Sequence, residues 1–558
     1  MIRSFPRLAA LTGLLLAAPA VARDAGAPQR PNFLVIVTDD LGYSDIGAFG
    51  GEIDTPNLDA LALSGLRLTG FHTAPACSPT RAMLMTGSDS HRVGLGAMAE
   101  VTQDNQKGQP GYEGFLRADT ATLAERLSAS GYRTLYSGKW HLGVRPEQDP
   151  HARGFQHSFA LLQGGHNHFG LGLSDDPMTG TTYREDGVVV KSLPADFYSS
   201  DYFGDKLVQQ IKTTKRGADG TKPFFAYLAF TAPHFPLQAP AETVAKYKGR
   251  YDAGYEALRE QRLKRQRELG LIDAATQPHR LIDVSKWEEL TPDQRKAESR
   301  EMEVYAAMVY RVDKAVGRVV AALKETGEFD NTVILFLADN GAEGMELTES
   351  GVAMLRDRAR AAAGDFESIG TAKSYVSYGR GWAQAATAPS WRFKTYASEG
   401  GTRAVAFLAG PIVRQPGAIG RAYTHVTDVT PTFLELAGVP FEQGRFAGRA
   451  IQPIDGLSWG NFLKTGAPVY PADKPVGNEL FGSRSLRQGD WKITDIADGR
   501  WHLFNIAADP GETRDLSAQE PARKAALIKA WEDYAKRVGL VLPNPVIKPN
   551  APLNSDGE

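Results

Sequence analysis

Two apolar segments of strand length, each followed by polar residues, constrain the fold of this chain most. Residues 32–38 (NFLVIVT) and 332–338 (TVILFLA) are continuous and rich in β-branched side chains, which is typical of buried parallel strands. Helical periodicity lies between them, so the pattern predicts an α/β sheet. Ligands of such sheets bind beyond the carboxyl ends of the strands. We therefore expect one site to contain the residues that follow the two segments, namely Asp39, Asp40, Asp339 and Asn340.

Other strands of the predicted sheet also end in polar residues. Periodicity predicts four further elements: helices at 120–130 and 301–324, and strands at 132–136 and 223–229. Lys139 and His141 follow the first of these strands, and His234 follows the second. Their shared position after strands places them at the same edge of the sheet.

The length of the chain predicts one large domain and one smaller one, because 558 residues exceed a single ordinary core. Short strands and a helix at 521–538 indicate that the smaller domain is α+β. We predict a large domain at 23–455 with a helical insertion at 241–300, a small domain at 456–545 and a flexible tail at 546–558.

The first 22 residues are typical of a secretory signal peptide. Arg3 and Arg7 precede a short apolar run at 8–20, and Ala20-Val21-Ala22 fits a cleavage site. The run is shorter than the ~20 residues that a membrane span needs. We therefore expect cleavage, a secreted or periplasmic location, and no association with a membrane.

Charge and cysteine content exclude some classes of protein. The formal net charge is −2, without the basic excess of a nucleic-acid-binding domain, so no nucleic-acid partner is expected. The chain has one cysteine, Cys77, and so cannot form an internal disulfide. In an exported protein such a cysteine is either a spare thiol or a chemical group.

The segment around Cys77 carries the most specific pattern in the chain. Residues 77–87 (CSPTRAMLMTG) fit C-x-P-x-R-x-x-x-x-T-G. This segment resembles the signature of the sulfatase family. In that family a separate enzyme, either a formylglycine-generating enzyme or an anaerobic maturation enzyme, oxidises the cysteine to formylglycine (3-oxoalanine). The hydrate of this aldehyde is the nucleophile.

The resemblance extends over nearly the whole mature chain and is strongest to bacterial arylsulfatases. It implies an alkaline-phosphatase-like fold, in which helices flank a large mixed sheet and a smaller C-terminal α+β domain follows. The segments that carry it, besides the signature, are PNFLVIVTDDLG at 31–42, TPNLD at 55–59, GKWHLG at 138–143, APHFP at 232–236, DNG at 339–341, EGG at 399–401 and DPGE at 509–512. One departure is Ser398, where relatives often carry histidine.

The acidic strand ends predict a metal site. Aspartate and asparagine offer only oxygen ligands, which favours Ca²⁺ or Mg²⁺ over zinc. The resemblance favours calcium, with Mg²⁺ as the weaker alternative. The predicted ligands are Asp39, Asp40, the modified Cys77, Asp339 and Asn340.

The resemblance also suggests how the cationic residues act. Arg81 lies four residues after Cys77, so that on a helix both would share one face, and it would orient the nucleophile. Lys139 and Lys394 would neutralise sulfate oxygens as charge develops. Asp339 is the candidate to accept a proton from the nucleophile.

Two histidines are predicted to move protons. His234 is the candidate general acid that protonates the leaving alcohol or phenol. His141 is the candidate base for the later step that releases sulfate and regenerates the aldehyde, although the two roles could be exchanged. His72, His91, His166 and His168 have no definite role, and the last two are candidates for lining the substrate entrance.

The predicted activity is hydrolysis of sulfate monoesters, with small aryl sulfates as the leading substrates. One alternative is a phosphodiesterase or phosphonate monoester hydrolase with the same nucleophile, because phosphate diesters match sulfate monoesters in size and charge. A second alternative is an inactive binding protein in which Cys77 stays a thiol.

Overall fold

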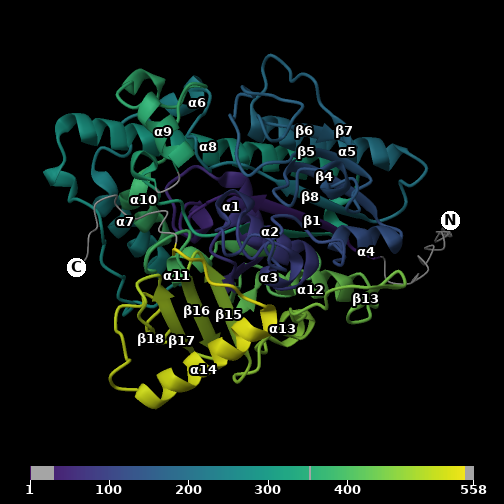
Figure 1. The fold of residues 1–558 in the computed structure, drawn as a ribbon. Coiled ribbons are helices and arrows are strands. Elements are labelled where there is room, and N and C mark those ends of the chain that lie inside the picture. Colours follow the sequence, from purple (N-terminus) through teal and green to yellow (C-terminus); the bar gives the residue numbers. More distant parts are fainter. Residues whose placement is uncertain (2–29, 351–352, 547–558) are drawn as a thin grey trace.

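The computed structural model describes residues 1, 30–350 and 353–546, and its large domain is built on a ten-stranded mixed sheet (Figure 1). The strand order is β11-β2-β10-β9-β1-β8-β4-β5-β6-β7. The central strands, which pair in parallel, are β9 (Thr332–Ala338), β1 (Asn32–Thr38), β8 (Phe224–Ala229), β4 (Arg133–Lys139) and β5 (His157–Leu161). The predicted signal peptide and most of the predicted tail lie outside the described residues.

The edges of the sheet make it mixed. β10 (Ala406–Ala409) pairs antiparallel with β9, and β2 (Leu66–Leu68) pairs antiparallel with β10. The outer strands are β11 (Ile419–Gly420), β6 (Tyr183–Glu185) and β7 (Val188–Val189). The structure thus confirms the predicted large mixed sheet flanked by helices.

Helices cover both faces of the sheet. Figure 1 shows α5 (Ser199–Arg216) and α8 (Pro292–Glu325) on one side, and α4 (Leu123–Ala129) and α12 (Val429–Leu436) on the other. The remaining α-helices of the large domain in the described residues are α1 (Pro56–Ser64), α2 (Cys77–Thr86), α3 (Ser90–Val93), α6 (Ala241–Ala245), α7 (Gly254–Glu268), α9 (Ala353–Ala362), α10 (Gly379–Thr387), α11 (Glu399–Thr402) and α13 (Gly460–Thr465).

The insertion is less solvated than its charge suggests. Its helix α7 carries Arg262, whose side chain is fully buried. Arg262 pairs with Asp45 at 2.5 Å and with Glu52 at 2.7 Å. These buried ion pairs fix α7 to the loop that follows β1, next to the acidic strand end.

The small domain is an antiparallel sheet with one long helix. Its strands are β15 (Pro475–Leu480), β16 (Ser483–Gln488), β17 (Trp491–Ile496) and β18 (His502–Asn505), which pair in chain order. Leu527 and Trp531 of α14 (Pro521–Val538) pack on Leu486 and Ile493 of the sheet. The predicted α+β domain is therefore present, whereas Trp459, just beyond the predicted boundary, packs in the core of the large domain.

Across the described residues, no helix is both long and apolar enough to span a membrane.

Candidate active site

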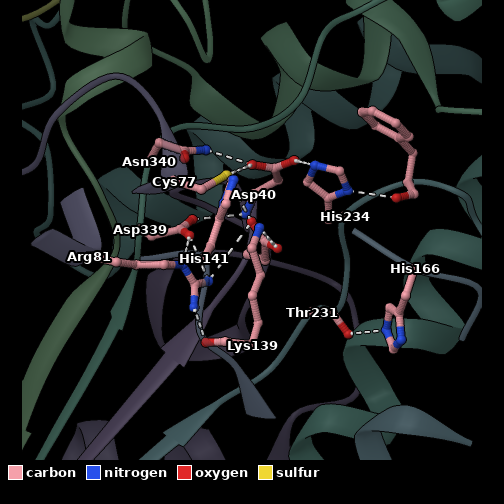
Figure 2. Close-up of polar contacts among 12 residues, drawn as sticks. Asp40, Cys77, Arg81, Lys139, His141, His166, Thr231, His234, Asp339 and Asn340 are labelled. Carbon is pink, nitrogen blue, oxygen red and sulfur yellow. Dashed lines mark hydrogen bonds and ion pairs between the residues drawn. The ribbon is translucent and has the colours of Figure 1, made fainter. Parts of the chain in front are cut away.

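The polar residues predicted to meet at the carboxyl edge of the sheet lie together in the structure (Figure 2). Asp39 and Asp40 follow β1, and Asp339 and Asn340 follow β9, its parallel neighbour. Lys139 is the last residue of β4. The site therefore forms because the carboxyl ends of parallel strands lie at the same edge of the sheet.

Cys77 lies at the first position of α2, facing the two acidic residues that follow β1. Its Sγ donates a hydrogen bond to Asp39 Oδ1 at 3.1 Å and lies 3.8 Å from Asp40 Oδ1. The side chain is almost fully buried. Burial and the charge of Asp39 raise the pKa of the thiol well above its usual value, although Lys139 and Lys394 oppose this. An unmodified Cys77 is thus a protonated thiol, which is a poor nucleophile.

Two buried lysines neutralise the acidic pair. Lys139 Nζ lies 2.6 Å from Asp39 Oδ2, and Lys394 Nζ lies 2.8 Å from Asp40 Oδ2. Lys394 also lies 2.9 Å from Glu343 Oε2. Burial opposes ionisation of Asp39, but Lys139 and the other nearby cations hold its pKa far below the usual range. For Asp40, the effect of burial exceeds that of Lys394, and the pKa is raised.

Arg81 holds Asp339 through one edge of its guanidinium group. Nε and Nη2 donate to Asp339 Oδ2 at 2.9 and 2.7 Å, and Nη1 donates to the carbonyl oxygen of Lys139 at 3.0 Å. Burial and the neighbouring Asp39 raise the pKa of Asp339 to about 7. Its carboxyl group is therefore held in place and titrates near neutral pH.

The chemistry of these side chains fits a hard divalent cation. Ligand atoms of Asp39, Asp40, Cys77 and Asp339 all lie within 4.8 Å of one another. Asn340 Nδ2 donates to Asp40 Oδ1 at 2.7 Å, whereas its Oδ1 is buried without a hydrogen-bond partner among the described residues. A buried amide oxygen without a partner is costly unless something binds it. Carboxylates with a spare amide oxygen form the donor set that Ca²⁺ and Mg²⁺ prefer.

His234 borders the same carboxylates. Its Nε2 lies 3.6 Å from Asp40 Oδ2, and its Nδ1 contacts the carbonyl oxygen of Phe235 at 2.5 Å. Burial, with the charge of Lys394, lowers the pKa of His234 to about 3. The imidazole is therefore neutral here, with a proton on Nδ1 and the lone pair of Nε2 on the side of Asp40.

His141 has a different neighbour. Its Nε2 lies 3.1 Å from Glu100 Oε1, and its Nδ1 is buried without a hydrogen-bond partner in the described part of the chain. Burial lowers its pKa, while Glu100 opposes the shift and Lys139 and Arg81 add to it. All the predicted catalytic side chains thus surround Cys77, although their roles stay predictions.

The comparisons with known proteins identify the family. A family model described as Sulfatase matches residues 31–439. The chain belongs to the sulfatase family. An uncharacterized sulfatase of Schizosaccharomyces pombe is 44% identical and covers 92% of this chain and 95% of its own length. An arylsulfatase of Klebsiella aerogenes is 40% identical over 81% of this chain and 95% of its own length. The chain is accordingly a sulfuric ester hydrolase, and the predicted resemblance to bacterial arylsulfatases is confirmed.

Solved structures support the same sulfatase fold. The crystal structure of Ps i-CgsB in complex with k-i-k-neocarrahexaose has a TM-score of 0.66 and 26% identity, and covers 91% of this chain and 93% of its own. A putative sulfatase of Bacteroides fragilis, at 19% identity and a TM-score of 0.60, matches the fold alone. The alkaline-phosphatase-like fold predicted from the motifs is thus confirmed.

Two residues of this sulfatase site escaped prediction. Glu343, the partner of Lys394, lies four residues after Asp339. Its closeness in sequence to this predicted metal ligand could have indicated that it belongs to the site. Glu100 lies in the short 3₁₀ turn Ala99–Val101, in a segment without a recognisable motif. Its contact with His141 depends on tertiary structure alone.

The four histidines without a predicted role are buried and contact neighbouring side chains or backbone groups. His166 and His168 are buried, and His168 Nε2 lies 3.2 Å from the carbonyl oxygen of His234. His72 and His91 lie where the two domains meet. His72 contacts Glu399 at 2.9 Å. His91 contacts Glu479 of β15 at 3.3 Å.

Proposed function

We propose that this sulfatase hydrolyses aryl sulfate monoesters through a formylglycine made from Cys77. The position of Cys77 carries the proposal. Its side chain is buried at the start of α2, facing Asp39 and Asp40, within a cluster of three carboxylates and three cations. A structural cysteine would need none of these charges, which are expensive to bury.

A calcium ion would be held by Asp39, Asp40, Asp339, Asn340 and the modified residue 77. The fit of the donor set and the spare oxygen of Asn340 support this proposal. When bound, calcium supplies Lewis acidity toward sulfate oxygens and favours ionisation of the nucleophile.

The cationic residues prepare the site for a compact anion. Arg81 holds Asp339 by two hydrogen bonds, so this carboxyl group keeps a fixed position as it takes up or releases the nucleophile's proton. Lys139 and Lys394 bring positive charge to the two sides of the cluster. Such fixed charges stabilise developing negative charge without rearrangement.

The acid role of His234 requires a proton on Nε2. The low pKa of the imidazole opposes this in the resting site, whereas an arriving sulfate ester brings negative charge and favours it. The role is testable with leaving groups. His234→Ala should slow esters of poorly acidic alcohols more than esters of acidic phenols, and equal slowing of both would contradict the acid role.

The apolar cluster that packs beside His234 is our reason to favour an aromatic leaving group. The ring of Phe235 stacks on His234 with centroids 4.2 Å apart, and Tyr375 packs edge-on against Phe235. Met345 and Leu347 belong to the same cluster. Aromatic and apolar side chains of this kind favour an aryl group over a hydrated sugar.

Burial of Cys77 bears on the maturation enzyme. The side chain is 1% exposed, so an enzyme that oxidises it must act before this part of the chain folds. The same enclosure would later protect the reactive aldehyde from other nucleophiles.

Matched substrates test the proposal. We expect kcat/KM to be higher for 4-nitrophenyl sulfate than for bis(4-nitrophenyl) phosphate, which has the same charge and leaving group. A reversed preference would favour the phosphodiesterase alternative. No turnover of either ester, together with an unconverted thiol at Cys77 in protein from the native host, would favour the inactive binding protein.

A further inference from the structure

We propose that Glu100 and Gly164 are positioning residues for His141, and that together they leave Nδ1 as the ring nitrogen available for proton transfer. Glu100 would do this by accepting the Nε2–H, and Gly164 by leaving space for the ring. The proton-transfer role of His141 rests on the proposed function. The placement of its ring by Glu100 and Gly164 is a property of the resting protein and does not depend on that function.

The carboxylate of Glu100 determines which ring nitrogen carries the proton. Glu100 Oε1 lies 3.1 Å from His141 Nε2, and a carboxylate can only accept a hydrogen bond. A neutral imidazole has one N–H, so a proton on Nε2 leaves a lone pair on Nδ1. Nδ1 is buried and has no hydrogen-bond partner among the described residues. The same logic orients the histidine of hydrolytic triads, in which a carboxylate fixes the tautomer.

Gly164 borders the same ring. A Cβ built on Gly164 would lie 2.5 Å from His141 Cε1 and 2.6 Å from Nε2, closer than real side chains approach. The backbone of Gly164 is not in the left-handed region. The glycine is therefore required by lack of space and not by backbone conformation.

The next residue supplies a matched control. A Cβ on Gly165 would lie 3.7 Å from Cε1 of His234, which is an ordinary contact. Alanine at 164 should therefore displace His141, whereas alanine at 165 should leave both histidines in place. The two variants differ by one position in the same loop and add the same methyl group.

Glu100 can be replaced without disrupting the core, since its side chain is 48% exposed. We expect Glu100→Ala to lower kcat for 4-nitrophenyl sulfate about 10- to 100-fold, the scale known for carboxylates that orient metal-ligating histidines. Glu100→Gln, which keeps an acceptor oxygen, should recover part of the loss. In the His141→Gln background, Glu100→Ala should cost nothing further, because the residue it positions is already gone.

Nitrogen NMR of the imidazole rings tests the positioning independently of activity. We would record ¹⁵N-resolved histidine spectra of full-length protein with unconverted Cys77, and assign His141 from the signals lost in His141→Gln. The expected result is a proton on Nε2 in the wild type and in Gly165→Ala, and a mixture of tautomers or shifted signals in Glu100→Ala and Gly164→Ala.

The outcomes separate the two proposals. A proton on Nδ1 in the wild type, or an unchanged His141 signal in Glu100→Ala, would overturn the positioning role. Normal tautomers in a converted protein that hydrolyses no sulfate ester would leave the positioning intact and overturn the proposed function.

Discussion

One buried cluster of charged side chains lies at the carboxyl edge of the large sheet of this sulfatase, and another lies between the two domains. The active-site cluster comprises Asp39, Asp40, Asp339, Arg81, Lys139 and Lys394. The domain-interface cluster comprises His72, Glu399, Lys492 and Glu512. Both pair carboxylates with cations away from water.

The clusters differ in how completely their polar atoms are used. In the domain-interface cluster, Glu399 contacts His72 at 2.9 Å and Lys492 at 2.8 Å, and its backbone N–H donates to Glu512 at 2.8 Å. Each buried polar side-chain atom of these four residues has a hydrogen-bond partner within the part of the chain that the structure describes. Beside the active-site cluster, Asn340 Oδ1 and His141 Nδ1 lack partners among the described residues. The two clusters thus share buried charge, and they differ in the spare buried acceptors that lie beside the cluster proposed to bind the metal and the substrate.

The largest expected effect comes from removing the predicted nucleophile. Cys77→Ala should reduce kcat for 4-nitrophenyl sulfate about 10⁶-fold, the scale of nucleophile deletion in other hydrolases. The fold should survive, because alanine fits the space and leaves every ion pair of the active-site cluster intact. Activity assays and circular dichroism check this. Substantial residual turnover would show that residue 77 is not the nucleophile.

Removing the lysine of the domain-interface cluster should affect stability instead. Lys492→Met leaves Glu399 buried without its lysine, and loss of one partner of a buried pair costs about 3–5 kcal/mol. Chemical denaturation would measure the loss. KM should be unchanged in the molecules that remain folded. Lys139→Met in the active-site cluster is the matched variant. It also leaves a buried carboxylate without its lysine, so it should cost similar stability, but it should in addition lower kcat in the folded molecules. A loss of kcat in Lys492→Met and none in Lys139→Met would contradict the comparison.

A third expectation concerns pH and the contact between the domains. His91 contacts Asp89 at 2.9 Å and Glu479 at 3.3 Å, and Tyr534 of α14 donates to Asp89 at 2.7 Å. Burial opposes protonation of His91, but its two carboxylate partners raise its pKa to about 9. A raised histidine pKa stabilises the fold fully below pH ~6.5, and this stabilisation is lost as pH rises through 9.

The size of this contribution is about 3 kcal/mol, from roughly 1.4 kcal/mol per unit of pKa shift. The wild type should be more stable than His91→Gln at pH 6.5. The difference between their free energies of unfolding should therefore shrink as the pH rises from 6.5 to 9. A difference that stays constant with pH would show that His91 is not charged in the folded protein.

The smallest expected effect is stabilisation by calcium. After treatment with a chelator, added Ca²⁺ at 100 times its Kd should stabilise the fold by about 2.7 kcal/mol, seen as a rise in Tm. Asn340→Leu should reduce this response, because it removes the spare oxygen of the site. Lys492→Met should retain it. A larger response to Mg²⁺ than to Ca²⁺ would contradict the proposed metal.

The strands that form the active-site cluster were predictable because their signals are local. β1 and β9 match their predicted bounds, since buried parallel strands are continuous apolar runs. The helix predicted at 301–324 begins earlier, at Pro292, where Thr291 and Gln294 form a capping box before the apolar stripe starts. The capping box is visible in the sequence, but it lies before the region of helical periodicity from which the helix was predicted.

Contacts that join distant segments were not predictable from patterns. The EGG and DPGE segments were recognised, but no pattern indicated that Lys492 of β17 would join Glu399 to Glu512. Glu100 likewise gives no local signal of its contact with His141. Such pairs form only when the chain is folded, because their partners are determined by tertiary packing and not by spacing along the sequence.

The mass of the tryptic peptide 68–81, taken from protein made in its native host, tests the central claim most directly. This peptide contains Cys77 and ends at Arg81. Conversion of the thiol side chain to an aldehyde lowers the mass of the peptide, and the account predicts that lowered mass in the fraction with sulfatase activity. An active fraction whose peptide carries only the unmodified thiol would contradict a site built around a converted Cys77.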